Sequence, residues 1–393
     1  MLVQFSVTNY RSIRNQATIS FKASIDKAME ANLIEAANKQ RLLPALSVYG
    51  ANASGKSNLL RALLLMGEMV CGKYARLLKD DKLPYEPFSF VKNLTAPIEL
   101  DIIFYMDGIK YAYGFSYNQE HIQSEYLYHW PRGREALIFS RDSDRYIFRE
   151  NVDEQTRLAL HTSSNRLYLT SSHEWNNKHT ENAFMWFVKN MMDANSDMYL
   201  RGLTIEAVKR GKESKSQLLR EMMTADLDID DVEIQEHSGE KRIVTYRRLG
   251  KDGDVYQLPL EQESAGTQFF FSRIGIWLKA LAEGGLIVMD GIDTSLHPLL
   301  ARHLVELIQD SSLNKNGAQL LFTAYDVCLL EHNLLRRDQI WFVEKDNGTL
   351  ETELYALTEF SPRKTENIAK GYLQGRYGAI PFVKESLNYN GFT

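Results

Sequence analysis

Residues 50–57, which read GANASGKS, are the segment whose residue types and spacing most clearly support chemistry. They match the pattern G-x-x-x-x-G-K-[ST], in which a strand runs into a glycine-rich turn and a helix follows. Gly50 and Gly55 let backbone N–H groups point inward at phosphate oxygens, and the helix N-terminus adds positive charge. Lys56 is expected to reach the β- and γ-phosphates, and Ser57 to coordinate Mg²⁺. The predicted nucleotide contacts here are Gly50, Ala51, Asn52, Ala53, Ser54, Gly55, Lys56, Ser57 and Asn58.

A second segment, LIVMDGIDTSLHP at residues 286–298, supplies the acidic end of a buried strand. Four apolar residues run into Asp290, which we predict to be an outer-sphere or water-mediated partner of Mg²⁺ beside Ser57. In most ATPases a carboxylate follows this aspartate, whereas here the next residue is Gly291. The segment therefore raises the question of whether a bound nucleotide is hydrolysed or only held.

A third segment, ESAGTQ at residues 263–268, opens an apolar helix about 20 residues before the acidic strand. Ser264 is the expected N-cap of that helix. The segment resembles the signature motif of ABC-type ATPases, which closes over the nucleotide bound to the P-loop of a second subunit. The resemblance implies a dimer around two ATP molecules, formed with a second copy or a paralogue. It implies trans nucleotide contacts from Ser264, Ala265, Gly266 and Thr267.

The elements that must position these residues follow from hydrophobic periodicity and turn residues. In the first half, the pattern predicts strands at 2–7, 16–22 and 46–49, a helix at 56–69, an antiparallel meander over 97–150 with a turn at Asp107–Gly108, and helices over 151–226, including 181–195 and 205–225. In the second half, it predicts strands at 232–237 and 242–249 joined by a turn at Gly239, a helix from 264, a strand at 286–290, a helix at 298–309, a strand at 318–324, a helix from 326 to about 335, and strands at 339–345 and 350–357. Alternating strands and helices in the last third imply a parallel sheet with crossover helices.

Composition narrows the class of protein. The chain has 393 residues, a net charge of −5 and two cysteines, Cys71 and Cys328, far apart in the sequence. This is an ordinary globular composition without a disulfide framework, so a reducing compartment is expected. The N-terminal MLVQFSVTNY alternates like a strand and lacks the features of a signal peptide, and no apolar run reaches 18 residues. We therefore expect a cytoplasmic protein with no membrane span.

Several further strings resemble one branch of the ABC-type ATPases. FSVTNYRSI at the N-terminus is similar to the opening strand and turn of the SMC- and RecF-like branch. DGIDTSLHP, TAYD, RRDQIWFVEKD and GYLQGRYGAIPF resemble the RloA- and AbiL-type ATPases of bacterial anti-phage and abortive-infection loci, which are related to the ATPase halves of OLD-family nucleases. The resemblance covers roughly residues 1–120 and 240–385. It implies that Arg11 lies near the nucleotide, and that Asp293 and His297 lie in the segment that touches the opposite subunit.

Two positions depart from the pattern of that family. Its acidic strand normally ends in Asp-Glu-x-Asp, whose glutamate polarises the attacking water, but Gly291 has no side chain. Its switch histidine lies in Thr-Thr-His-Asp, whereas residues 323–326 read TAYD, with Tyr325 in the histidine position. General-base assistance is typically worth about 10²- to 10⁴-fold in rate. Slow or absent ATP hydrolysis is therefore expected, unless Asp293 acts as a substitute base.

The predicted fold is α/β, a P-loop ABC-type ATPase head with a mixed sheet, an antiparallel β subdomain and a helical insertion. Residues 1–150 are predicted to form the N-terminal part of the head, 151–230 the helical insertion, and 231–393 the C-terminal part with the signature, the acidic strand and the switch region.

Two functions fit these observations. The first is an ATP-binding subunit of a bacterial anti-phage defence system, which dimerises around ATP and controls a separate effector, expected to be a nuclease. The second is an active ATPase acting on DNA, in RecF-like repair or DNA sensing. Both need ATP and Mg²⁺, and ATP is favoured over GTP only by the resemblance. The expected partners are a second copy and the effector, with nucleic acid in the alternative, and no membrane.

Overall fold

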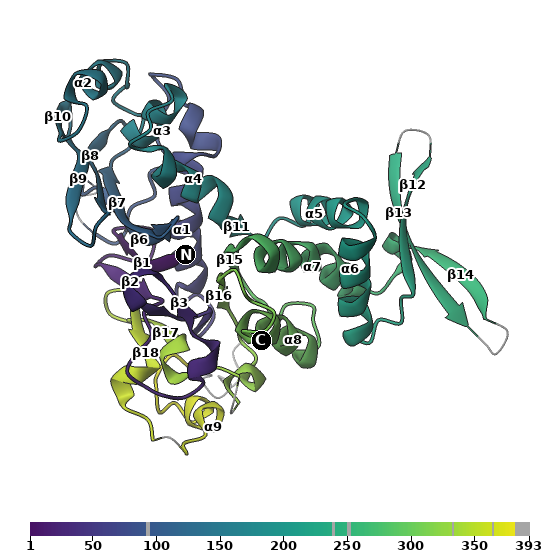
Figure 1. The fold of residues 1–393 in the computed structure, drawn as a ribbon. Coiled ribbons are helices and arrows are strands. Elements are labelled where there is room, and N and C mark those ends of the chain that lie inside the picture. Colours follow the sequence, from purple (N-terminus) through teal and green to yellow (C-terminus); the bar gives the residue numbers. More distant parts are fainter. Residues whose placement is uncertain (92–94, 238–239, 250–252, 332–333, 364, 382–393) are drawn as a thin grey trace, which may run out of the picture.

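The computed structural model describes residues 1–91, 95–237, 240–249, 253–331, 334–363 and 365–381. Its helices and strands build a body with two large sheets, from which a smaller arm extends (Figure 1). Within the described residues, no helix is both long and apolar enough to cross a membrane. The prediction for Gly239 concerns a residue outside the described part of the chain.

The larger sheet is a seven-stranded antiparallel sheet, as the alternation over 97–150 predicted. Its strand order is β10-β9-β8-β7-β6-β1-β2. The strands are β1 (Leu2–Thr8), β2 (Ala17–Ser20), β6 (Ile98–Met106), β7 (Ile109–Tyr117), β8 (Ile122–Trp130), β9 (Ala136–Asp142) and β10 (Arg145–Phe148). Asp107 and Gly108 both have positive φ and connect β6 to β7, which confirms the predicted hairpin turn.

The second sheet is mixed and has the order β11-β15-β16-β5-β17-β18. Its strands are β5 (Ala45–Tyr49), β11 (Met191–Asp193), β15 (Gly285–Met289), β16 (Ala318–Thr323), β17 (Ile340–Lys345) and β18 (Thr352–Ala356). All neighbours pair in parallel except β17 and β18. This arrangement confirms the predicted mixed sheet with crossover helices, and it places the ends of β5, β15 and β16 at one edge.

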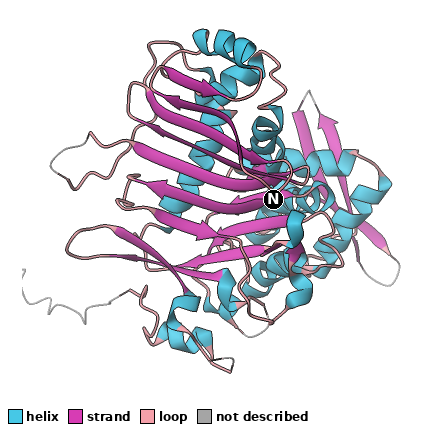
Figure 2. Cartoon of the chain, turned by 60° about the vertical axis from the view of Figure 1, so that its left-hand side comes forward, coloured by secondary structure: helices cyan, strands magenta, loops and turns pink. Residues whose placement is uncertain are grey.

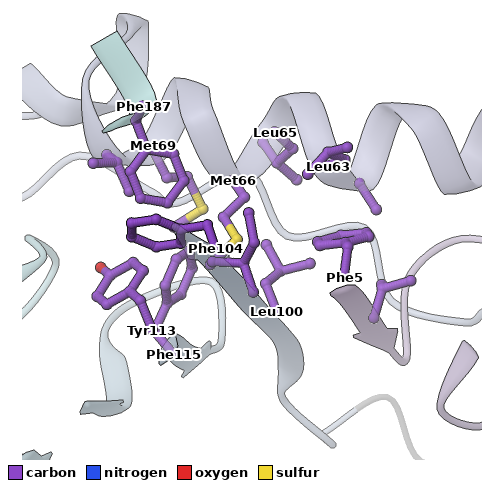
Figure 3. Packing of buried hydrophobic residues seen from close by; sticks show 14 of the residues in the cluster. Phe5, Leu63, Leu65, Met66, Met69, Leu100, Phe104, Tyr113, Phe115 and Phe187 are labelled. Atoms are coloured by element: carbon purple, nitrogen blue, oxygen red, sulfur yellow. The ribbon is translucent and has the colours of Figure 1, made fainter. Parts of the chain in front are cut away.

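Helix α1 (Lys56–Val70) packs against both sheets, and Figure 1 shows it beside β6 and β15. Figure 2 shows the strands of the sheets side by side with helices packed behind them. Leu63 and Met66 of this helix are fully buried in a core that also contains Leu100 and Phe104 of the antiparallel sheet and Val288 of the mixed sheet. Figure 3 shows side chains from α1, β1, β6 and β7 packed together in this core. Because α1 is held from both sides, its N-terminal end is fixed against the end of β5.

The other face of the mixed sheet is covered by α7 (Ala265–Glu283), α8 (Pro298–Gln309) and α9 (Ile368–Leu373). Alternate residues of β15 divide between the two cores: Leu286 and Val288 face the α1 side, whereas Ile287 and Met289 face the α7 side. The predicted helix at 298–309 is confirmed, with Pro298 at a position where its missing N–H has no cost.

The helices between 151 and 226 pack in two separate places. Helices α2 (Val152–Leu160), α3 (Tyr168–Glu174) and α4 (Glu181–Asn190) contribute to the core beside the antiparallel sheet, whereas α5 (Asp197–Lys209) and α6 (Lys212–Thr224) contribute to the core around α7. The arm seen in Figure 1 consists of α5, α6 and the sheet β12 (Asp231–His237), β13 (Glu240–Leu249) and β14 (Asp254–Pro259). The division into three parts along the sequence remains a prediction.

One predicted helix ends earlier than expected, and a second predicted helix is wrong. The helix expected over 181–195 ends at Asn190, and Met191–Asp193 form β11 on the edge of the mixed sheet. The hydrogen bonds of β15 therefore override the helical pattern of this segment. The helix expected from Asp326 is only a 3-10 turn at Val327–Leu330, since the chain becomes extended at Glu331. Burial of Leu329 and Leu330 explains the apolar pattern without a longer helix. Strand β14 was not predicted.

Candidate nucleotide site

The glycine-rich loop between β5 and α1 is held from behind by the edge of the mixed sheet. A Cβ atom at Gly50 would lie 2.2 Å from the carbonyl oxygen of Val343, and one at Gly55 would lie 2.3 Å from Thr352 Oγ1. Gly55 also has a φ of 112°. Thr352 Oγ1 donates to the Ser54 carbonyl oxygen at 2.8 Å. Both glycines are therefore required by close backbone approach as well as by conformation.

The fit of this loop to a phosphate chain can be judged from its polar groups. Ser54 Oγ is buried and has no hydrogen-bond partner among the described residues. Lys56 Nζ donates to the carbonyl oxygens of Gly50 at 2.7 Å and Ala51 at 2.9 Å, so the ammonium lies inside the curve of the loop. A buried cation enclosed by a loop at a helix N-terminus is suited to an anionic ligand. Residues 50–58, assigned from the motif, thus form one continuous cradle.

Lys56 has an unusual environment for a lysine. Its side chain is buried, and its ammonium lies 4.1 Å from the centre of the Tyr325 ring. Burial lowers the pKa of Lys56 to about 8, although the carboxylates of Asp290 and Asp293 act in the opposite direction. The ammonium is therefore poorly hydrated before any ligand contacts it.

Ser57 and Asp290, the two predicted Mg²⁺ partners, line the same cavity of about 460 Å³. Thr323 Oγ1 donates to Asp290 Oδ1 at 2.6 Å and accepts from the Gly291 N–H at 2.7 Å. A hydroxyl and a carboxylate facing one space are hard oxygen ligands of the kind that Mg²⁺ takes together with phosphate oxygens. The residues present fit the ion, and they would hold it there.

Two polar residues of this cavity were not identified from the sequence. Asp193 is the last residue of the short strand β11, Asn195 lies two residues further on, and both line the cavity beside Asp290. Asn195 Oδ1 accepts from the Asp290 N–H at 2.8 Å, and its amide group donates to Asp193 Oδ1 at 2.6 Å. The sequence MMDAN was interpreted as a helix end, and a three-residue strand has too little alternation to be recognised.

Arg11 also faces this cavity, as the resemblance implied. Its Nε donates to Glu86 Oε2 at 2.7 Å, and its backbone N–H donates to the Glu86 carbonyl oxygen at 2.8 Å. Arg11 has a φ of 51°, which is uncommon for a residue with a side chain. The double contact with Glu86 holds this conformation and keeps the guanidinium at the cavity wall.

Gly291 has a backbone conformation that disfavours the family's glutamate. Its φ is 72°, and a Cβ atom there would lie 2.4 Å from Thr294 Oγ1. A glutamate at this position would combine a left-handed backbone with a close contact. The change to glycine therefore affects the course of the loop as well as removing a carboxylate.

Asp293 uses one of its oxygens to hold the neighbouring loop. Its Oδ2 accepts from the N–H groups of Tyr325 and Asp326, both at 2.6 Å. Its Oδ1 is buried and has no partner among the described residues. Any role as a substitute base would fall to Oδ1, since Oδ2 already accepts two hydrogen bonds.

The signature segment is held by the arm and lies beside the loop after β15. Ser264 Oγ accepts from the Thr267 N–H at 3.1 Å, which confirms the predicted N-cap. The position where Gly266 would carry a Cβ atom is 3.5 Å from the Ser295 carbonyl oxygen. Glu263, the first residue of the segment, accepts from Arg247 of β13 at 2.6 and 2.9 Å. The described residues contain no hydrogen bond from Ser264, Ala265, Gly266 or Thr267 to the cradle.

His297 is the N-cap of α8 and is exposed, with its Nδ1 accepting from the Leu299 N–H at 3.3 Å. This capping contact uses one ring nitrogen only. An interface role for His297 remains a prediction.

The fold and the site define this protein as a P-loop ATPase of the ABC type. The chain belongs to the family described as "AAA domain, putative AbiEii toxin, Type IV TA system", whose model matches residues 46–324. That match includes the cradle, the signature segment and the acidic strand. No match was found among curated proteins.

Among solved structures, the chain is similar to an SMC head domain from Thermotoga maritima, with 13% sequence identity and a TM-score of 0.42. The alignment covers 90% of this chain and 98% of that one. It is also similar to an Smc head domain with an extended coiled coil, bound to the C-terminal domain of ScpA and derived from Pyrococcus furiosus. There the identity is 12%, the TM-score 0.41, and the coverage 96% and 99%. These similarities are remote, and neither says what this chain binds.

Proposed function

We propose that this chain is the ATP-binding ABC-type subunit of a bacterial anti-phage defence system. It dimerises around ATP in the cytoplasm and controls a separate effector, a nuclease, while its own hydrolysis is slow. The observation that carries the proposal is the cradle at residues 50–58, in which Lys56 is enclosed and Ser57 faces Asp290 across one cavity. The RloA- and AbiL-type resemblance and the family description, which names a toxin of a toxin–antitoxin system, support the role in defence.

The chain's own residues would hold the nucleotide. The N–H groups of the cradle and Lys56 bind phosphate oxygens, while Ser57 and Asp290 hold Mg²⁺. Bound Mg²⁺ neutralises charge on the phosphates when ATP is present. Thr323 donates a hydrogen bond to a carboxylate oxygen of Asp290, and Asn195 accepts one from the Asp290 N–H. These two contacts orient Asp290.

Slow hydrolysis follows from the residues that lie where catalysis would need a base. Gly291 offers no side chain, and Asp293 is engaged with the loop at residues 325–326. Burial, followed by the nearby Asp290 and Asp293, raises the pKa of Tyr325 above its ordinary value. Tyr325 therefore stays neutral and can donate a hydrogen bond, but it cannot carry the positive charge available to a histidine.

A dimer is supported by the position of the signature segment. Ser264 to Thr267 form the N-terminus of α7 and make no hydrogen bond to the chain's own cradle among the described residues. A helix N-terminus that exposes N–H groups is suited to phosphate. Two copies arranged head to tail would bring each signature segment to the partner's cradle.

A second candidate, an ATPase that turns over, is favoured by one observation. Asp293 Oδ1 is buried and has no partner among the described residues, and the Asp293 carboxylate is near enough to Lys56 to raise its pKa. A carboxylate oxygen without a partner is free to accept a proton from water. In this candidate, Asp293 replaces the missing glutamate.

Nucleotide retention and turnover, measured on one sample, test the proposal. The purified protein is denatured, released nucleotide is identified by chromatography, and phosphate release is followed after adding Mg-ATP. Retained ATP with almost no phosphate release supports the proposal, and a neighbouring gene product should co-purify. Steady turnover that is lost in Asp293→Asn would establish the second candidate. A protein that binds no nucleotide would overturn both.

A further inference from the structure

We propose that Tyr325 is a positioning residue that lowers nucleotide affinity by covering Lys56. Its ring lies over the ammonium and competes with phosphate oxygens for that charge. The inference rests on the proposed nucleotide site, and it goes beyond it by assigning a regulatory contact to a residue that occupies the position of the family's switch histidine.

The contacts of Lys56 leave few directions open for a ligand. A lysine ammonium has three N–H donors. Two hydrogen bonds go to the carbonyl oxygens of Gly50 and Ala51, and the Tyr325 ring centre lies 4.1 Å away. Only 4% of Lys56 is exposed, and these three groups are the hydrogen-bond and ring contacts of its ammonium among the described residues. A phosphate oxygen can reach the ammonium only if at least one of them moves.

Of the three, the tyrosine is the group whose place is not required by packing. Its side chain is 54% exposed, although it is aromatic. The Gly50 and Ala51 carbonyl groups, in contrast, belong to the loop that Val343 and Thr352 constrain. The ring is therefore the part that a phosphate would displace.

The backbone that carries the ring is fixed by Asp293. Its Oδ2 accepts from the N–H groups of both Tyr325 and Asp326. On the other side, Asp326 Oδ1 accepts from the Cys328 N–H at 2.9 Å and caps the following 3-10 turn. The ring thus covers Lys56 because the loop at residues 323–326 is tied to the loop after β15.

Substitutions of Tyr325 can separate the effect of its aromatic ring on Lys56 from any effect of its hydroxyl group. Tyr325→Phe keeps the face that contacts the ammonium, and it should bind Mg-ATP within about twofold of the wild type. Tyr325→Leu removes the face, and it should bind roughly 2- to 30-fold more tightly, the range for a cation–π contact between exposed and desolvated sites. Tyr325→Gln serves as a second variant without the ring, and it should resemble Tyr325→Leu.

A second pair of variants tests the link to Asp293. Asp293→Ala releases the two N–H groups and should also tighten binding, because the ring is then less firmly held. In the Tyr325→Leu background the same change should have a smaller effect, since no ring remains to be released and only the negative charge of Asp293 near Lys56 is lost. Additive effects would contradict the proposed link.

The decisive experiment is isothermal titration calorimetry of Mg-ATP into the full chain, with folding of each variant checked by circular dichroism. Tighter binding by Tyr325→Leu and Tyr325→Gln, with Tyr325→Phe unchanged, supports the inference. If Tyr325→Phe binds more weakly, the hydroxyl contacts the nucleotide and the inference is overturned. Equal affinities in all variants also overturn it, while leaving the proposed function intact. Absence of binding by the wild type would instead refute the proposed function.

Discussion

The loop that follows β5, taken together with the start of α1, and the loop that follows β15 both contribute to the cavity at the nucleotide site, through Ser57 and Asp290. The polar groups of the two loops nevertheless have different partners. In the first loop, Ser54 Oγ has no partner in the part of the chain that the structure describes, and Lys56 turns inward toward a space suited to phosphate. In the second, Asp290 accepts from Thr323, and Asp293 holds two backbone N–H groups. The difference teaches that the first loop directs its cation toward a ligand once the Tyr325 ring moves away. The second loop uses its carboxylates mainly to hold its own structure, and only Asp293 Oδ1 has no partner among the described residues.

Removing the cation of the first loop should have the largest effect. Lys56→Ala is expected to weaken Mg-ATP binding by about 10- to 150-fold, because a hydrogen-bonded charge is lost. Calorimetric titration measures this change. Lys73→Ala is a matched control, since Lys73 lines the same cavity but pairs with Glu68 at 3.2 Å on its exposed rim. Equal losses in the two variants would mean that only general positive charge matters.

Restoring the family's carboxylate in the second loop should fail to restore hydrolysis. Gly291→Glu is expected to lower the free energy of unfolding by about 1–3 kcal/mol, because of left-handed backbone strain and the contact with Thr294 Oγ1. Urea unfolding and phosphate release measure the two effects.

Gly108→Ala controls for the backbone term, since Gly108 has a φ of 75° but no atom within 4 Å of its Cβ position. Any loss of unfolding free energy in Gly291→Glu beyond the loss in Gly108→Ala then measures the cost of the contact with Thr294 Oγ1. A gain in turnover of about 10²-fold or more in Gly291→Glu would show that the loop adapts readily, and that the carboxylate alone was missing.

Asp293 can be tested for its structural role separately from its charge. Asp293→Ala should cost about 1.5–3 kcal/mol of stability, since two N–H groups lose a charged acceptor. Asp293→Asn keeps an acceptor oxygen and should cost much less, with residual phosphate release unchanged. Thermal unfolding and phosphate release distinguish the two variants. Complete loss of turnover in a stably folded Asp293→Asn variant would show that Asp293 acts as a base. The second loop would then take part in catalysis, and it would no longer differ from the first loop in having only a structural role.

The smallest effect is expected from pH. Burial lowers the pKa of Lys56 to about 8 in the protein without ligand, while a bound phosphate would favour the charged form and raise it. Binding therefore takes up a proton above pH 8, and the affinity should fall by about tenfold between pH 7 and 9. Titrations at several pH values measure this fall. Lys56→Arg keeps its charge throughout and should show a flat profile.

Much of the fold could be predicted because local patterns were strong. The Asp107–Gly108 turn, the helix after GANASGKS and the N-cap of α7 depend on residues within a few positions of each other. The short strand β11 and the 3-10 turn after Asp326 were missed, because their conformation is decided by partners distant in the sequence.

The candidate site likewise contains some features that depend on neighbouring residues and others that depend on distant ones. The sequence by itself determined the cradle, since its glycines, Lys56 and Ser57 are consecutive and their chemistry is local. Only the tertiary structure decided that Asn195 meets Asp290, that the Tyr325 ring lies over Lys56, and that Asp293 fixes the loop carrying that ring. These contacts join residues brought together by the order of strands in the mixed sheet. That order reflects the packing of whole elements, which no short stretch of sequence specifies.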